Sequence, residues 1–229
     1  MDKRIIVGTA FACIIIIVII TFSSYQANLL EMHDRDMYLE SITASQQSSL
    51  VNLENGSPPL GSESAPITIV EFGDYQCEVC YHWFHNTRST LIDNYIETGK
   101  AKLVFVDMPF IGRDSKIAAQ ASYCADDQGK YWEYHEILYT FQEVENSGWA
   151  DRDRLNSFAF SLDMNIDKFN ECMDSSKYKI RVQANFDEAV KQGAEGTPTF
   201  IIISQNGTME KFSGAQPYSV FPATIESML

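Results

Sequence analysis

The sequence predicts an α/β domain that carries a helical insertion and follows a single N-terminal transmembrane helix. Three observations predict this class. An uncharged apolar run lies near the N-terminus, short β-branched segments lie towards both ends of the remaining chain, and a long stretch of helical pattern, about 113–193, separates these segments. With 229 residues, of which 45% are hydrophobic, the chain is long enough for one well-packed domain and an anchor.

The apolar run covers residues 5–22, IIVGTAFACIIIIVIITF, and is long enough to span a bilayer as an upright helix. Lys3 and Arg4 precede it and acidic residues follow, so the positive-inside rule places the rest of the chain outside the cytoplasm. A cleaved signal peptide is the alternative. Because the run is longer than a usual signal core and no clear cleavage site follows it, we expect residues 1–24 to be an uncleaved, single-pass anchor in the cell membrane.

Residues 25–58 are polar and rich in Ser, Gln and Asn, and they end in an Asn-Gly-Ser-Pro turn sequence. Such a composition is typical of a stalk between an anchor and a folded domain. The domain is then expected to cover residues 59–229. Since it would lie outside the cytoplasm, its cysteines would meet an oxidising environment in which disulfides persist.

The first part of the domain predicts a strand–helix–strand unit. Residues 67–72 alternate and are β-branched, which indicates a strand, and residues 73–76 form a turn. Apolar side chains at helical spacing continue to about Glu97 and end at Gly99, and residues 102–107 form a second strand. A strand, a helix and a second strand that follows the helix after a short loop form a βαβ unit, in which the two strands should be parallel.

Residues 113–193 have helical patterns throughout, with breaks near Gly129, near residues 147–148 and at residues 163–165. This block is the predicted helical insertion. It is followed by a short β-branched strand at 199–203, a strong Asn-Gly hairpin signal, a return strand at 208–213, and a closing helix from Tyr218. The predicted order is therefore β-α-β, a helical block, and β-β-α.

The charge of the chain bears on its partners. Seventeen basic residues against 31 acidic ones give a formal net charge of −14, which disfavours binding to phosphate backbones. We therefore expect no nucleic-acid partner, and the acidity is best interpreted as favouring solubility. No metal or nucleotide cofactor is indicated.

The main candidate site is Cys77-Glu78-Val79-Cys80, between the first strand and the first helix. Two intervening residues in a first helical turn bring the two sulfurs within disulfide distance. The first cysteine then lies at the helix N-terminus, where free N–H groups and the helix dipole stabilise a thiolate, with pKa values of about 3.5–7.5 instead of about 8.5. Cys77 is the predicted nucleophile and Cys80 the more buried resolving thiol.

Two alternatives for this cysteine pair remain open. The pair could be half of a zinc site completed by His82 and His85, although four ligands would then have to converge from one helix. It could also be a short disulfide with a structural role only. For the two histidines themselves, surface or packing roles are favoured over catalysis.

Three separated motifs resemble the DsbA-like branch of the thioredoxin superfamily. They are Ile69-Val70-Glu71-Phe72, the Cys77-x-x-Cys80 pair, and Gly196-Thr197-Pro198-Thr199-Phe200, and the stretch from Cys124 to Trp132 with His135 resembles the helical insertion of that family. The resemblance runs from about residue 59 to the C-terminus and implies a thioredoxin-like fold. The anchor and stalk lie outside it.

The resemblance assigns roles to three further residues. Thr197-Pro198 matches the cis-proline loop that packs beside the cysteine pair, and the backbone of Thr197 would pair with an extended substrate. Glu71 matches a buried acid that could carry the proton of Cys80. The alternative for Glu71, which its position at a strand end favours by itself, is a carboxylate that faces water.

The activity implied is that of a thiol:disulfide oxidoreductase that oxidises reduced or unfolded extracytoplasmic polypeptides and is reoxidised by a membrane partner. Well-known oxidases of the family often have Pro-His between the cysteines. Glu78 here places a negative charge beside Cys77, which should raise the thiolate pKa and make the disulfide less oxidising. A reductase or isomerase, or a non-catalytic membrane-tethered holdase, therefore stays open, although the chain has no dedicated dimerisation segment typical of isomerases.

Cys124 and Cys172 both fall in the helical block. In an oxidising compartment two such thiols are expected to pair and to tie two insertion helices together, with a stabilisation of about 4 kcal/mol in the chain-entropy model. The alternative is two buried, unpaired thiols.

Overall fold

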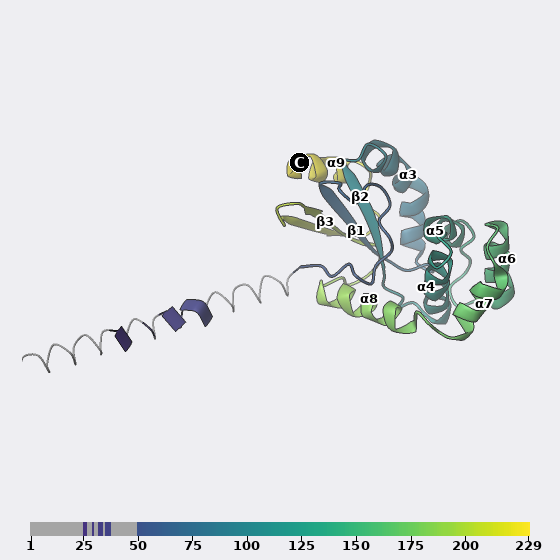
Figure 1. Cartoon of the computed structure of the whole chain (residues 1–229). Coiled ribbons are helices and arrows are strands. Elements are labelled where there is room, and N and C mark those ends of the chain that lie inside the picture. The colour runs from purple at the N-terminus through teal and green to yellow at the C-terminus, as the bar shows by residue number, and fades with distance from the viewer. Residues whose placement is uncertain (1–24, 27–28, 30–31, 34, 38–49) are drawn as a thin grey trace, which may run out of the picture. The chain divides into compact units, whose positions relative to one another are not determined.

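The computed structural model describes residues 50–229, together with residues 25, 26, 29, 32, 33 and 35–37. The predicted anchor lies outside these residues, and none of the described helices has the length and apolar character needed to cross a membrane. The chain divides into two units, Met1–Leu50 and Val51–Leu229. The described residues of the first unit between 25 and 37 are helical, and the second unit contains the strands and helices labelled in Figure 1.

A four-stranded sheet with the order β2-β1-β3-β4 forms the centre of the second unit. Its strands are β1 (Ile67–Gly73), β2 (Ala101–Asp107), β3 (Thr199–Ser204) and β4 (Met209–Ser213). β1 and β2 are parallel, as the short return between them predicts, whereas β3 runs antiparallel to both β1 and β4. Each predicted strand is confirmed to within one residue at each end.

Side chains alternate between the two faces of the sheet because a strand has a period of two residues. Ile67 and Ile69 of β1 pack on one face with Trp83 and Leu91 from the helical segment after Cys77. Val70 and its neighbours pack on the other face against α8 (Lys179–Lys191), which Figure 1 shows along that side of the sheet. Glu71 shares the face of Ile67 and Ile69, which is the face towards the cysteine pair.

The predicted helix after Cys77 is present and is divided by two π-helical segments. It runs through α2 (Glu78–Trp83), η1 (Phe84–Arg88), α3 (Ser89–Leu91) and η2 (Ile92–Ile96), and Gly99 with φ +73° follows its end. Segments of π-helix inside α-helices occur frequently at functional sites. Here the first of them begins one turn after the cysteine pair.

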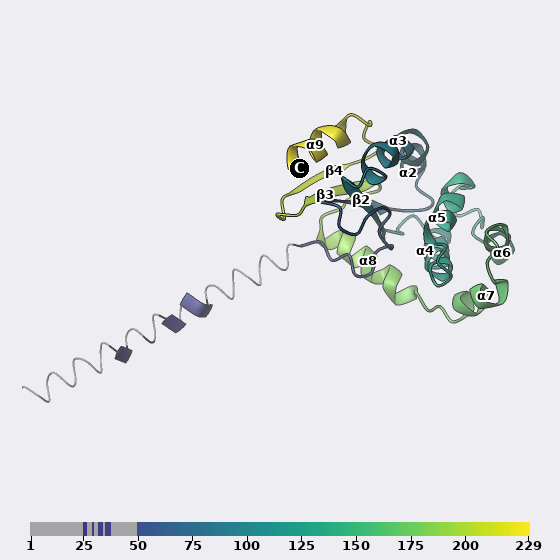
Figure 2. The same ribbon diagram turned by 45° about the horizontal axis from the view of Figure 1, so that its top comes forward.

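The helical insertion lies between β2 and β3, as predicted. Its helices before α8 are α4 (Arg113–Asp126), α5 (Tyr131–Thr140), α6 (Arg152–Ser161) and α7 (Ile166–Asp174). In both views α4 and α5 lie nearer the strands, and α6 and α7 lie at the far end of the insertion (Figure 2). Between α7 and α8 the chain turns at residues 175–178, where Ser176 has φ +53°. This last break was not predicted because no Gly or Pro marks it.

Both ends of the second unit pack on the sheet. Residues 51–58, which the sequence assigns to the stalk, belong to this unit, and Ser57 bonds to both backbone groups of Phe105 in β2 at 2.8 and 2.9 Å. The Trp132 indole donates to the carbonyl of Pro58. The C-terminal helix α9 (Val220–Met228) buries Phe221 and Ile225 against the opposite side of the unit.

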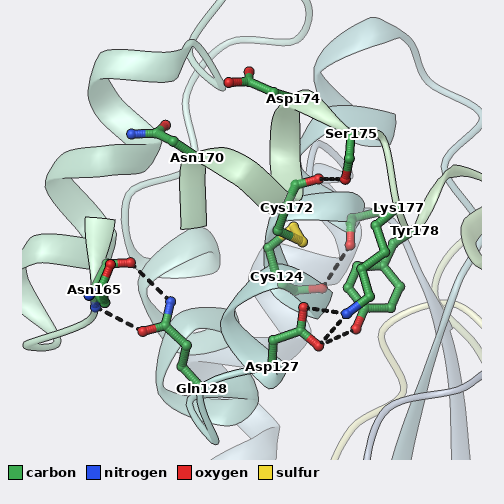
Figure 3. The surroundings of a disulfide bond; sticks show 12 residues. Cys124, Asp127, Gln128, Asn165, Asn170, Cys172, Asp174, Ser175, Lys177 and Tyr178 are labelled. Atoms are coloured by element: carbon green, nitrogen blue, oxygen red, sulfur yellow. Dashed lines mark hydrogen bonds and ion pairs between the residues drawn. A yellow bond between two sulfur atoms is a disulfide. The ribbon is translucent and has the colours of Figure 1, made fainter. Parts of the chain in front are cut away.

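A disulfide joins Cys124 of α4 to Cys172 of α7, with the two Cα atoms 5.8 Å apart (Figure 3). Polar contacts surround it. Asp127 accepts hydrogen bonds from Lys177 and Tyr178, and the side chain of Gln128 bonds twice to the backbone of Asn165. The disulfide therefore fixes the C-terminal end of α4 to the far end of the insertion.

Candidate active site

Cys77 and Cys80 lie at the start of α2, where the chain leaves β1. Cys77 is the N-cap residue, and its sulfur accepts a hydrogen bond from the backbone N–H of Cys80 at 3.2 Å. Both cysteines are free thiols in this structure, Cys77 is 5% exposed, and Cys80 is fully buried one turn further on. An incoming sulfur can thus reach Cys77 more easily than Cys80.

The environment of Cys77 favours its thiolate. The pKa of Cys77 is lowered from 9.0 to about 7, and a hydrogen bond from the Cys80 thiol is the largest cause. The Thr197 side chain and the backbone N–H groups of Cys80 and Val79 contribute to this lowering, and burial opposes it. The pKa of Cys80, in contrast, is raised well above 9.0 by burial and by the nearby negative charges.

Glu78 does not reverse this preference. Its side chain is 85% exposed, and its nearest ionisable partner is His82, at 3.7 Å. A charge in such a position is screened by water. The pKa of Cys77 is lowered overall, as its predicted position at the helix N-terminus led us to expect, and the charge of Glu78 is not among the main causes that act on it.

The loop before β3 lies against the cysteine pair. The Thr197-Pro198 peptide bond is cis, and the Cys77 thiol donates a hydrogen bond to the carbonyl of Thr197 at 3.2 Å. Pro198 is buried, and its carbonyl accepts a bond from Gly214. Residues 120 positions apart in the chain are therefore in direct contact at the site.

Glu71 is buried beneath the cysteines, with 1% of its surface exposed, so it does not face water as its strand-end position suggested. Burial raises the pKa of its carboxyl from 4.5 to about 8, the charge of Arg88 lowers it, and Cys77 raises it. Glu71 in turn raises the pKa of Cys80. The structure therefore places a carboxyl that is largely protonated at neutral pH within electrostatic reach of both thiols.

The turn before Cys77 is attached to the helical insertion by residues that the sequence analysis did not identify. Asp74 accepts bonds from the backbone of Gln76 and Ile111. The side chain of Gln76, which is 1% exposed, bonds to Ser115, Asn146 and Trp149. These contacts link segments far apart in the sequence, so no local pattern could have indicated them.

A cavity of about 440 Å³ opens beside the cysteine pair. It is lined by Gln76, Glu78, Tyr81, His82, Gln142, Glu143, Val144 and Glu145. His85 packs on the ring of Tyr81 with ring centroids 4.1 Å apart. Among the residues that the structure describes, no group of His, Cys, Asp and Glu side chains is arranged to hold a metal ion.

Two cysteines at a helix N-terminus, beside a cis-proline loop and above a buried carboxyl, define a dithiol–disulfide exchange site on a thioredoxin-like fold. A protein-family model described as "Thioredoxin" matches residues 54–226, and the chain belongs to this family.

The relatives specify the branch of the superfamily. The "Probable disulfide bond formation protein D" of Bacillus cereus is 28% identical over 205 residues, which cover 88% of both chains. The "Disulfide bond formation protein D" of Bacillus subtilis is 30% identical over 150 residues, covering 64% of this chain and 68% of that protein. The chain is a DsbA-like member of the thioredoxin superfamily and a thiol:disulfide oxidoreductase.

Solved structures agree with the fold. Oxidised BdbD from Bacillus subtilis superposes with a TM-score of 0.69 at 27% identity, covering 77% of this chain and 94% of that one. The α-DsbA1 protein of Wolbachia pipientis superposes with the same TM-score at 24% identity, covering 78% and 93%. This second likeness concerns the fold alone.

Proposed function

We propose that this enzyme donates disulfides to reduced polypeptides outside the cytoplasm, through Cys77 and Cys80. The observation that carries the proposal is the asymmetry of the pair: an accessible N-capping thiol with a lowered pKa precedes a buried thiol with a raised one. The names of the Bacillus relatives, which refer to disulfide bond formation, support the oxidising direction.

The proposed reaction has two exchange steps. In the oxidised enzyme a substrate thiolate attacks Cys77 Sγ, a bond forms between the two sulfurs, and the Cys77–Cys80 bond breaks with its electron pair on Cys80. A second substrate thiolate then attacks the substrate sulfur of this mixed disulfide, and Cys77 leaves as a thiolate. The substrate gains one disulfide, and the enzyme ends in the dithiol form.

Three other residues have proposed roles in these steps. Glu71 gives a proton to Cys80 as that thiolate is released, which its raised pKa and its proximity support. Pro198 holds the loop against the cysteine pair, and the backbone of Thr197, which contacts Cys77, pairs with an extended substrate. Cys124 and Cys172 have a structural role in the insertion.

The proposed arrangement in the cell follows from the N-terminal sequence. Residues 1–24 are a single-pass anchor in the cell membrane that crosses it at 5–22, residues 25–50 of the predicted stalk are the spacer, and residues 51–229 are the catalytic domain on the outer side. A membrane oxidase, quinone-linked as in the wider family, then reoxidises the dithiol. The substrates are unfolded or reduced polypeptides outside the cytoplasm.

The second candidate is a disulfide reductase, and one observation favours it. A thiol pKa of about 7 stabilises the reduced enzyme much less than the value of about 3.5 found in a strongly oxidising DsbA. The Cys77/Cys80 pair would then have a lower reduction potential and would give electrons to substrates more readily.

The reduction potential of the full chain in detergent micelles, equilibrated with glutathione, distinguishes the two candidates. A value between about −230 and −120 mV, with loss of thiols from a reduced two-cysteine peptide mixed with the oxidised enzyme, supports the donor. A value near −270 mV overturns the donor and supports the reductase. Cys77→Ala tests the non-catalytic holdase, because a holdase variant would still suppress client aggregation, whereas the enzyme would lose all thiol exchange.

A further inference from the structure

A charged guanidinium is buried within electrostatic reach of Glu71. Arg88, the last residue of η1, is 4% exposed and lies over the rings of Phe84 and Trp132, at 5.1 and 5.6 Å from their centroids. One nitrogen, Nη1, donates to Glu136 Oε1 at 3.2 Å. No acceptor within the described part of the protein bonds to Nε or Nη2.

Further polar atoms in the same region also lack protein partners. Neither carboxylate oxygen of Glu71 receives a hydrogen bond from a described residue. The same holds for Nε2 of His135, although its Nδ1 lies 2.9 Å from the Tyr75 hydroxyl. Arg88 acts electrostatically on both Glu71 and His135. The region between β1, η1 and α5 thus gathers one fixed positive charge and two groups that can gain or lose a proton.

Only some of these groups titrate over the working range of the enzyme. Arginine keeps its charge in proteins. Burial and Arg88 lower the pKa of His135 well below 6.5, so this imidazole stays neutral, and burial with the nearby acidic groups raises the pKa of Tyr139 well above 10.0. The carboxyl of Glu71 and the two thiols remain as the groups that change charge.

Burying an arginine at position 88 is unfavourable for the stability of the fold. A buried charge with incomplete pairing costs free energy, and an apolar side chain of similar size at such a place is often at least as stabilising. Its ion-pair partner Glu136 is 55% exposed and compensates little of that cost. The buried charge therefore points to a role in the reaction.

We propose that Arg88 is a positioning residue for thiol–disulfide exchange. It stabilises the carboxylate that forms on Glu71 when Glu71 gives its proton to Cys80. Its ion-pair partner Glu136 is half exposed, and the proton that returns to Glu71 enters from the solvent on that side. When the Cys77–Cys80 bond breaks, the electron pair goes to Cys80 and the proton comes from Glu71, so a negative charge moves from sulfur to the carboxylate near Arg88. A water proton then returns to Glu71. The inference rests on the proposed roles of Cys80 and Glu71 but not on the direction of net electron flow.

The test is the pH profile of disulfide opening. The oxidised full chain in micelles reacts with dithiothreitol between about pH 5 and 10.5, and each rate is divided by the rate of the same reagent with oxidised glutathione. Dividing by this reference rate cancels the pH dependence that arises from ionisation of the dithiothreitol thiol. We expect an inflection from Glu71 in the wild type that is absent in Glu71→Gln, and an upward shift of its midpoint by about one pH unit or more in Arg88→Gln.

Matched variants separate this role from a structural one. Arg88→Lys keeps the charge and should restore the wild-type midpoint, and Glu136→Gln keeps the arginine and should move it less than Arg88→Gln does. In the Glu71→Gln background, Arg88→Gln should leave the profile unaltered. An unshifted midpoint in Arg88→Gln, or an equal change of the profile without Glu71, would overturn the inference, and neither result bears on whether the wild type oxidises peptides.

A folding measurement covers the case in which Arg88→Gln is unstable. At pH 9 the gain in stability against urea caused by Glu71→Gln should be larger in the Arg88→Gln background than in the wild type, because without Arg88 nothing compensates the charge of Glu71. An equal gain in the two backgrounds would show that the charges of Arg88 and Glu71 are not coupled and would overturn the inference.

Discussion

Replacing Cys80 by alanine should raise the pKa of Cys77. In the structure the Cys80 thiol is the largest single cause that lowers the pKa of Cys77 to about 7 from 9.0. That difference corresponds to about 2.7 kcal/mol of preference for the thiolate. Since Cys77 is only 5% exposed, solvent screens little of this interaction. The backbone N–H of residue 80 remains in the variant, so any rise in the pKa of Cys77 is caused by removal of the Cys80 thiol alone.

The size of the effect can be bounded from these values. If the pKa returned fully to 9.0, the thiolate fraction at pH 7 would fall from about one half to about one in a hundred. Each thiolate would become about eight times more nucleophilic, because nucleophilicity rises with pKa at a Brønsted slope of about 0.45. The net result is alkylation up to about six times slower at pH 7 and up to about seven times faster at pH 10.

The assay is the rate of iodoacetamide alkylation of Cys77 between pH 5 and 10, with thiolate absorbance in the ultraviolet as a second measure of the midpoint. Cys77→Ala gives the background from Cys80, which its buried position and raised pKa should keep slow. The profiles of the wild type and of Cys80→Ala should cross. A Cys80→Ala midpoint that stays near 7, or falls, would show that the thiol–thiolate bond does not stabilise Cys77.

The same pKa sets an expectation for the reduction potential. At pH 7 a thiol pKa of about 7 stabilises the reduced enzyme by about 0.4 kcal/mol relative to a pKa of 9.0, or about 9 mV. A thiol pKa of about 3.5, as in DsbA, contributes about 100 mV on the same scale. We therefore expect a potential about 90 mV below that of DsbA, near −210 mV. A value near −120 mV would refute this reasoning.

Three further predictions concern single features of the site and the insertion. Glu71 has a folded pKa of about 8 against 4.5 in the unfolded chain, so the folded state binds the extra proton between these values and stability falls as pH rises; the loss from pH 5 to pH 8 is about 3.5 kcal/mol. Glu71→Gln should remove that loss, measured by urea unfolding at both pH values. The double variant Cys124→Ala/Cys172→Ala should unfold with about 4 kcal/mol less stability, as followed by circular dichroism. Thr197→Val removes a hydroxyl but keeps the carbonyl, and it should raise the alkylation midpoint of Cys77 by less than Cys80→Ala does.

Each of these has an outcome that contradicts it. An equal pH dependence in Glu71→Gln and the wild type would assign the loss to other groups, of which Asp107, with a pKa raised to about 7 by burial, is the first to examine. An unchanged stability without the Cys124–Cys172 disulfide would show that contacts such as Asp127 with Lys177 hold the insertion by themselves. An unshifted midpoint in Thr197→Val would mean that the hydroxyl does not stabilise the thiolate.

The parts of the fold that were predictable from the sequence are those that local chemistry determines. The β-branched segments indicated the strands, and the short return after the first helix indicated the parallel pairing. The spacing of Cys77 and Cys80 indicated the position at a helix N-terminus. The thioredoxin-like fold and its helical insertion followed from the resemblance and are confirmed.

The parts that were missed depend on long-range packing. The sequence position of Glu71 at a strand end favoured exposure, but the strand lies inside the sheet between β2 and β3, and its period of two turns Glu71 towards the helix that begins at Cys77. Arg88 occupies a helical position at which an arginine normally faces water. Its place in the site depends on the ring of Trp132, from the insertion, which covers it and which no local pattern connects to it.

Simultaneous ionisation of Cys77, Cys80 and Glu71 is electrostatically unfavourable. A thiolate on Cys77 raises the pKa of Glu71, and a carboxylate on Glu71 raises the pKa of Cys80. The reduced enzyme can therefore hold one negative charge at Cys77 readily and a second one only with compensation. A bond from the Cys80 thiol compensates at the sulfur, and the charge of Arg88 compensates at the carboxylate. Because the bond from the Cys80 thiol exists only in the dithiol form, it raises the reduction potential, and weakening it should make the enzyme a poorer donor of disulfides. Arg88 acts on Glu71 in the disulfide form as well, so its charge bears on the proton transfer to Cys80 rather than on the potential.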